Sequence, residues 1–290
     1  MISVVLYVIV VLIWGSTWLA VKYQIGPVSP EISIAYRMGS AALIIFLMGL
    51  IKKHSFRFAV REHVVMILQG ASLFSLNFFF FYIAAESIIT GLIAVICSTA
   101  SAMTVILNCL FSRRLPPIQI AMGASLGILG VGLIFSGELF ESQLHQATAH
   151  GFLYAVGGTF CFSMGTIIAA QKREPGRSSL AGTAWAMSYG TALLCFLAVL
   201  RGKAFNFDPS PSYVWSLAYL SVVGSVIAFI AYFSLLKRIR PEQAAYVTVL
   251  FPVVALTLST FFEGYQWTAV TVLGVVITLL GNLLIAWRTS

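Results

Sequence analysis

The chain has 290 residues, of which 60% are hydrophobic and only 9% are charged. A soluble domain carries roughly 25% charged residues, so this composition excludes a water-soluble globular protein and favours membrane-spanning helices. The four cysteines lie in apolar runs without a CxxC pair, which argues against a zinc site or a disulfide framework.

Ten apolar segments follow one another along the chain, each close to the roughly 20 residues that a spanning helix needs. The first segment lacks a basic start and a clear cleavage site, so it is predicted to be a helix rather than a signal peptide. The predicted helices cover 3–22, 32–51, 63–84, 88–111, 118–137, 150–170, 181–200, 213–236, 242–262 and 267–287.

The basic residues gather in alternate loops. With the N-terminus in the cytoplasm, thirteen of the seventeen Lys and Arg residues lie on the cytoplasmic side. The positive-inside rule therefore predicts that both termini are cytoplasmic. This distribution accounts for the net charge of +8 without a nucleic-acid partner. The lipid bilayer is the expected surrounding, and the oligomeric state is left open.

The chain divides into two similar halves, 1–138 and 150–288, joined by a loop without basic residues. An odd number of helices in each half makes the second half enter the membrane from the opposite side. We therefore predict an all-α polytopic membrane protein with ten transmembrane helices arranged as two inverted five-helix repeats. Residues that recur 150 positions later include Ser75, Phe79, Tyr82, Ile89, Ala94 and Phe111, matched by Ser225, Phe229, Tyr232, Ile239, Ala244 and Phe261.

The last helix of each half carries two glycines seven residues apart. They are Gly123 and Gly130 in the first half, and Gly274 and Gly281 in the second. Small residues allow the backbones of two helices to approach closely, so these positions predict helix-packing contacts.

Two tryptophans, Trp14 and Trp18, lie one turn apart on the same face of the first helix. They lie in the middle of the span, too deep for an aromatic belt at the membrane surface. They are predicted either to form an aromatic wall of a substrate cavity or to pack against neighbouring helices.

A stripe of small and polar residues runs along the fourth helix and includes Ser98 and Ser101. Its counterpart in the ninth helix includes Thr248 and Phe251, with the Tyr246 hydroxyl close by. Such residues can line a cavity or let helices approach, and close packing is the favoured interpretation.

Ser75 and Tyr82 share one face of the third helix because they are seven residues apart, and Ser225 and Tyr232 do the same in the eighth. We predict that this repeated Ser/Tyr face looks into the substrate cavity.

Arg37 lies about one and a half turns into the second helix, where a charge is costly and suggests a function. The favoured prediction is a structural ion pair with Glu31 or Glu86. The alternative is a gate, or a contact with a substrate carboxylate.

Three segments of the chain are distinctive. They are LIWGSTWLAVK from Leu12, SPEISIAYRMGSAALI from Ser29, and GSVIAFIAYFSLLKRIRPEQAAYVTVLFPVVALTLSTFFEG from Gly224. Through these segments, and over essentially its whole length, the chain resembles the EamA-type branch of the drug/metabolite transporter superfamily. The resemblance implies two inverted repeats, a central cavity, and export or exchange of small metabolites across the bacterial inner membrane. The family often has Pro in the fourth helix and Glu at its end, where this chain has Ala102 and Arg113. The fourth helix is therefore expected to be straighter than the ninth.

These features predict an alternating-access transporter of small metabolites such as amino acids, with a multidrug or toxic-compound exporter as the alternative. No acid or His lies in the middle of a predicted span, and no GxxxxGK[ST] loop is present, so ATP is not the expected energy source. No metal, cofactor or catalytic cluster is expected. An enzyme is therefore disfavoured, as is a receptor or scaffold, because the loops are short.

Overall fold

The structure is a computed structural model. It describes residues 2–53, 55–113, 115–140, 145–170, 179–236, 238–239 and 247–288. These residues form helices and no strands. Eight helices are long and apolar enough to cross a membrane, and they match the first eight predicted spans. The last two predicted spans correspond to the shorter apolar helices Val247–Phe262 and Ala269–Ile285.

The first half contains α1 (Ile2–Lys22) and α2 (Pro30–Ile51), followed by a rod made of α3 (Val60–Ala71), the π-helical segment η1 (Ser72–Leu76) and α4 (Asn77–Ala85). After a short turn come α5 (Thr90–Ser98), α6 (Ala100–Phe111) and α7 (Ile118–Phe140).

The remaining helices belong to the second half of the chain. This half contains α8 (His145–Ala169), α9 (Ser179–Leu200), a rod made of α10 (Pro211–Ala218), the π-helical segment η2 (Tyr219–Ile227) and α11 (Ala228–Leu236), then α13 (Val247–Phe262) and α14 (Ala269–Arg288). A π-helical segment thus interrupts the corresponding rod in each half.

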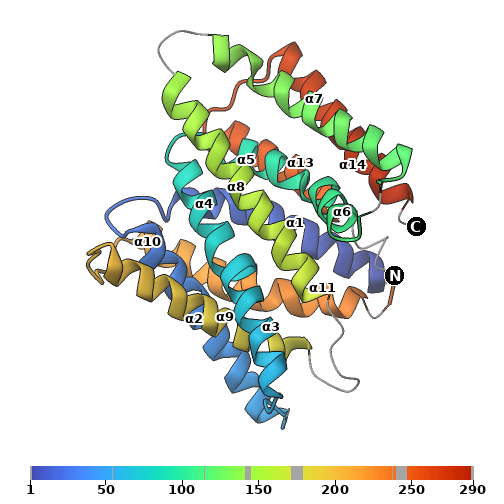
Figure 1. The fold of residues 1–290 in the computed structure, drawn as a ribbon. Helices are drawn as coiled ribbons and strands as arrows, with labels where there is room; N and C mark the ends of the chain where they lie inside the picture. Colours follow the sequence, from blue (N-terminus) through green and yellow to red (C-terminus); the bar gives the residue numbers. More distant parts are fainter. Residues whose placement is uncertain are drawn as a thin grey trace.

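The helices form a bundle with α7 and α14 side by side at one edge and α2 and α9 packed together at the opposite edge (Figure 1). Between these two pairs, α1 contacts α5, α11, η2 and α13. Helix α1 therefore touches elements of both halves, which gives its side chains access to the interface between them.

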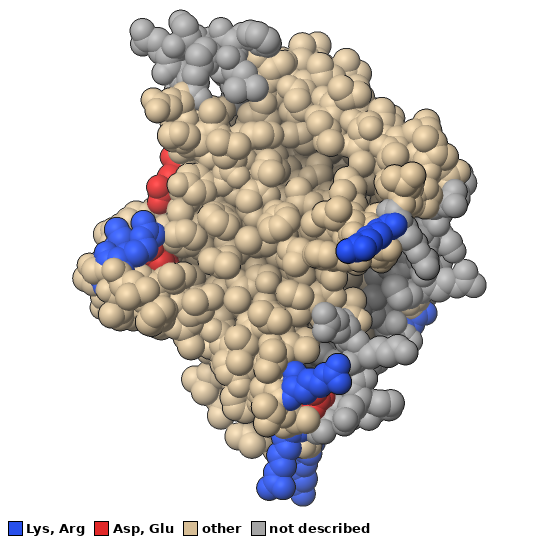
Figure 2. Space-filling view, in the orientation of Figure 1, with Lys and Arg blue, Asp and Glu red and all other residues tan. Residues whose placement is uncertain are grey.

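Charged side chains gather near the edges of the face drawn in Figure 2, and a wide uncharged surface lies between them. Large apolar side chains such as Leu43, Ile128 and Phe196 are exposed on the bundle surface, where water would disfavour them and lipid would not.

The α7–α14 pair is held together by backbone contact at its glycines. A Cβ atom at Gly123 would lie 2.7 Å from the carbonyl oxygen of Gly281, and one at Gly274 would lie 2.7 Å from that of Gly130. Any larger residue would push the two helices apart. The predicted packing role of these glycines is confirmed, and their pairing in opposite chain directions makes the two helices antiparallel.

The fourth predicted helix lacks the proline of the ninth but is not continuous, and whether it is the straighter of the two stays a prediction. The fourth is interrupted at Thr99, between α5 and α6, whereas α13 continues across Pro252. The side-chain hydroxyls of Ser98 and Thr99 donate to the carbonyls of Val95 (2.7 Å) and Ile96 (2.6 Å). Hydroxyls that bond back to the preceding turn compete with the helical hydrogen bonds and bend helices, so this break needs no proline.

Candidate functional site

The two tryptophans of α1 lie in an aromatic cluster that joins both halves of the chain. Trp14 contacts Phe229 and Tyr232 of α11, with ring centroids 5.9 and 5.0 Å apart. Trp18, one turn along, contacts Phe81 of α4 (5.1 Å) and Phe251 of α13 (6.2 Å). We call these six residues the α1 aromatic cluster.

The α1 aromatic cluster brings together four of the predicted site residues: Trp14, Trp18, Tyr232 and Phe251. Both tryptophans and Tyr232 are only partly buried. Phe81 and Phe229 were not predicted as site residues. Phe229 could have been predicted, because it is one of the residues that recur between the two halves.

Ser75 and Ser225 use their hydroxyls inside their own helices. Ser75 Oγ donates to the carbonyls of Gly70 (3.1 Å) and Ala71 (2.7 Å), and Ser225 Oγ donates to that of Leu220 (2.9 Å). Both serines lie in π-helical segments, both reach a carbonyl five residues back, and both are buried. The repeated serine thus satisfies backbone carbonyls at the wide turn, and a hydroxyl so engaged has no proton left for a substrate.

Tyr82 is buried and faces Arg37 rather than the α1 aromatic cluster. Its hydroxyl lies within electrostatic range of the Arg37 guanidinium, although the two groups do not have the geometry of a hydrogen bond. The guanidinium stacks on the ring of Phe78, 4.4 Å from the ring centroid. Phe78 was not predicted as a site residue. Its position four residues before Tyr82 would have placed it on the same face of α4.

The predicted ion pair of Arg37 with Glu31 or Glu86 is wrong. Glu31 pairs with Arg201 at the end of α9, and Glu86 is exposed. The physical reason is the helical rotation: Glu31 is six residues from Arg37, which turns its side chain roughly 240° around α2. The Nε and Nη1 atoms of Arg37 have no hydrogen-bond acceptor, and its side chain is only 4% exposed.

Ser98 and Ser101 face α14. Asn282 Nδ2 donates to Ser98 Oγ (2.9 Å), and Ser101 Oγ lies 3.4 Å from Asn282 Oδ1. These contacts agree with the packing interpretation of this stripe. Asn282 was not identified from the sequence, although it is a lone amide in an apolar helix.

The second-half counterparts of that stripe lie partly outside the described residues. Thr248 is partly buried near the start of α13 and has an interaction partner. Phe251 belongs to the α1 aromatic cluster. Tyr246 is outside the part of the chain that the structure describes.

Several contacts join the two halves at the end of the bundle that holds Lys22, here called the Lys22 end. Lys22 Nζ donates to the carbonyl of Phe262 (2.9 Å), and Gln24 Nε2 donates to Ser216 Oγ (2.6 Å). The carboxylate of Glu263 accepts from the hydroxyl of Thr90 (2.7 Å) at the start of α5. These contacts tie α1, α5, α10 and α13 together.

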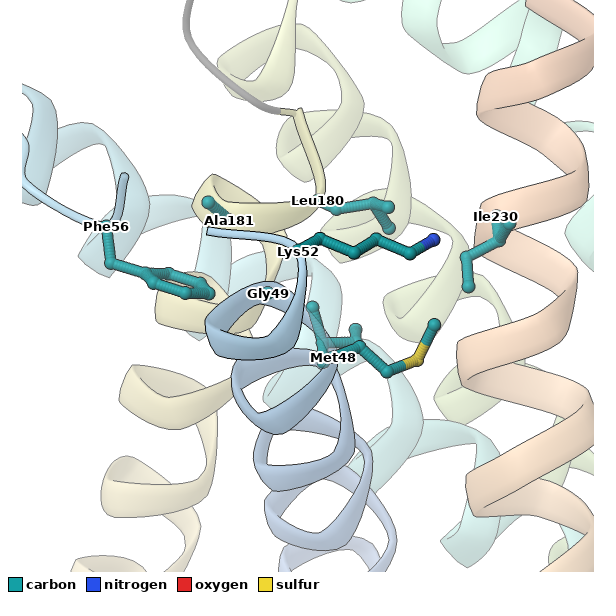
Figure 3. A pocket seen from close by; sticks show the side chains of 8 residues that line it. Met48, Gly49, Lys52, Phe56, Leu180, Ala181 and Ile230 are labelled. Atoms are coloured by element: carbon teal, nitrogen blue, oxygen red, sulfur yellow. The ribbon is translucent and has the colours of Figure 1, made fainter. Parts of the chain in front are cut away.

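The opposite end holds Lys52 and a small apolar pocket between α2, α9 and α11. Figure 3 shows the Lys52 side chain extending across this pocket toward Ile230. The pocket is lined by Ile45, Met48, Gly49, Lys52, Phe56, Leu180, Ala181 and Ile230. It contains none of the predicted site residues. Within the described ranges, no group of three or more His, Cys, Asp or Glu side chains could hold a metal ion.

Comparisons with known proteins agree with this architecture. A solved crystal structure superposes with a TM-score of 0.69 and 16% identity, covering 99% of this chain and 98% of that one, which shows that the two share a fold. The uncharacterized inner membrane transporter YedA of Escherichia coli K12 is 24% identical over 281 residues, covering 94% of this chain and 89% of the relative.

Two further relatives are similar over most of their length. The uncharacterized transporter YyaM of Bacillus subtilis is 25% identical, covering 93% of this chain and 88% of the relative. A probable amino-acid metabolite efflux pump of Salmonella typhimurium LT2 is 22% identical, covering 95% and 92%. The EamA-like transporter family matches residues 1–136 and 149–287. The chain therefore belongs to the EamA-like transporter family and is a multi-pass membrane transporter.

Proposed function

We propose that this protein is an alternating-access transporter that exports or exchanges small metabolites such as amino acids. The two five-helix halves are inverted repeats, both termini are cytoplasmic, and the Lys22 end faces outward. The halves rock around a substrate held beside α1.

Two observations support the inverted repeat. The glycines of α7 and α14 pair in opposite chain directions, as expected of matched helices related by a two-fold axis in the membrane plane. The π-helical segments η1 and η2 occur in corresponding rods, and their serines make the same five-residue hydrogen bond.

The observation that carries the proposal is the α1 aromatic cluster. One face of α1 contacts α4 of the first half and α11 and α13 of the second. A substrate that contacts these rings touches both halves at once, so its binding can favour one arrangement of the halves over another. Partly exposed Trp and Tyr rings suit small amphipathic molecules.

The relative named as a probable amino-acid metabolite efflux pump supports a metabolite substrate. A multidrug exporter is the rival, because aromatic side chains alone also bind drugs. We assign no enzymatic activity and no cofactor. Without a phosphate-binding loop or a mid-span carboxylate in the sequence, uniport or exchange is the preferred transport mode.

The test is release of labelled amino acids from loaded proteoliposomes, with and without a pH gradient. Transport that is independent of the gradient and faster than in empty-lipid controls is expected. A panel of hydrophobic cationic dyes, tested in the same vesicles, distinguishes the multidrug rival. If neither class moves, the proposed transport activity is wrong.

A further inference from the structure

Arg37 is a buried cation on α2, enclosed by α4 and η2. Its side chain is 4% exposed, and the face of its guanidinium is covered by the Phe78 ring. Gly224 of η2 lies beside the guanidinium, since a Cβ atom there would be in ordinary van der Waals contact with Nη2, at 3.9 Å.

No carboxylate compensates this charge among the residues that the structure describes. Glu31 pairs with Arg201, and Glu263 accepts from Thr90. Three other described acids are also placed elsewhere: Glu62 accepts from the Ala59 backbone, Asp208 accepts from the Ser210 backbone, and Glu86 is exposed.

The fold does not require a cation at this position. Helices α2 (Pro30–Ile51) and α9 (Ser179–Leu200) have the same length, and their bounds place Arg37 opposite Ala186, which is fully buried, as is its neighbour Met187. Burying an isolated charge is strongly unfavourable, whereas burying a methionine of similar length is not. A cation retained at such a cost points to an anion that arrives during the transport cycle.

The groups around Arg37 suit a carboxylate. Stacking on Phe78 occupies the face of the guanidinium and leaves its edge, with the unpaired Nε–H and Nη1–H groups, for acceptors in the plane. The Tyr82 hydroxyl, which also lacks a partner, is a further donor nearby. A planar two-oxygen anion matches this arrangement, and one cation balances one carboxylate.

We propose that Arg37, with Tyr82, is the subsite that binds the carboxylate of the transported metabolite. This inference rests on the proposed transport function and names its substrate class as small carboxylic acids, amino acids included. A buried cation repels cationic drugs, so the subsite also separates a metabolite transporter from a multidrug exporter. Opening of the contacts between α2, α4 and η2 admits the substrate.

The test compares each of several apolar amino acids with its own amide, which differs only in lacking the carboxylate. Binding is measured by thermal stabilisation of the purified protein in detergent, and transport by uptake into proteoliposomes. The wild type is expected to favour acids over amides by about 100-fold, because an amide leaves buried donors without an anionic partner. Equal binding of acids and amides overturns the inference.

Arg37→Met and Tyr82→Phe test the two groups separately. Arg37→Met is expected to fold, because methionine has a similar length and no charge to bury, and to lose the preference for acids. Arg37→Lys is expected to keep part of the preference for acids over amides. Lys203→Gln, which removes an exposed charge, is expected to keep the whole preference. An unchanged acid preference in Arg37→Met overturns the subsite. Acid binding without any transport in the wild type leaves the subsite standing and refutes the transport function instead.

Discussion

The carboxylate of Glu263, at the end of α13, accepts hydrogen bonds from the hydroxyl and the backbone N–H of Thr90, the first residue of α5, at 2.7 and 3.4 Å. The Ser259 hydroxyl also donates to this carboxylate and accepts from the N–H of Gly91 (3.0 Å). One acid from the second half thus caps the N-terminus of a helix in the first half, where the helix dipole favours a negative charge.

Glu263→Ala is therefore expected to loosen the Lys22 end of the bundle. The loss of a charged acceptor leaves two donors of α5 unpaired and lowers the free energy of unfolding by about 1–3 kcal/mol. Thermal melting in detergent measures this change. Glu86→Ala, at an exposed acid near the same end, is the matched control and should melt like the wild type. Equal melting temperatures for both variants would contradict the capping role.

Gly130→Ala is expected to separate α7 from α14. The added Cβ atom would lie 2.5 Å from the carbonyl oxygen of Gly274 and collide with Thr278, which overpacks the helix pair at a cost of about 1–3 kcal/mol. Gly132→Ala on the same helix meets nothing within 4 Å and is the control. The check is the fraction of protein that elutes as a single folded species and its melting temperature.

Trp14→Ala and Tyr232→Ala are expected to lower the rate of transport about tenfold, because they remove aromatic contacts from the proposed substrate site. Transport into proteoliposomes is compared at equal amounts of folded protein. Trp215→Ala is the control, since that ring is 75% exposed on α10 and takes no part in the α1 aromatic cluster. Full transport by both cluster variants would show that these rings only pack.

Ser75→Ala and Ser225→Ala are expected to affect stability and not substrate affinity. Each removes a donor that satisfies a carbonyl in a π-helical turn, at a cost of about 1 kcal/mol. The KM for transport should stay at the wild-type value in both variants. A several-fold rise in KM with an unchanged melting temperature would restore the direct substrate contact that the sequence pattern predicted.

The predicted site illustrates where sequence reasoning succeeds and where it stops. Trp14 and Trp18 could be assigned to one face of a helix because the spacing of side chains in a helix is a local property. The same reasoning placed Ser75 and Tyr82 on one face and expected them to act together. Ser75 instead closes a π-helical turn with its own backbone, and Tyr82 approaches Arg37, and neither partner follows from the spacing of the two residues.

Partners across helices could not be predicted in this way. Arg201 for Glu31, Asn282 for Ser98 and Thr90 for Glu263 are each more than 160 residues apart in the chain. Which residues meet depends on the rotation, tilt and depth of each helix, and these are decided by packing over its whole length.

The sequence by itself determined the long apolar helices, their order and the family resemblance. Whether a segment is long and apolar enough to cross a bilayer depends on its own composition, so it can be read locally. Only the tertiary structure decided that Arg37 has no carboxylate partner among the described residues, that α5 and α6 separate at Thr99, and that α1 joins both halves through its tryptophans. These properties arise from contacts between distant segments, where the cost of burying a polar group depends on what the neighbouring helix presents.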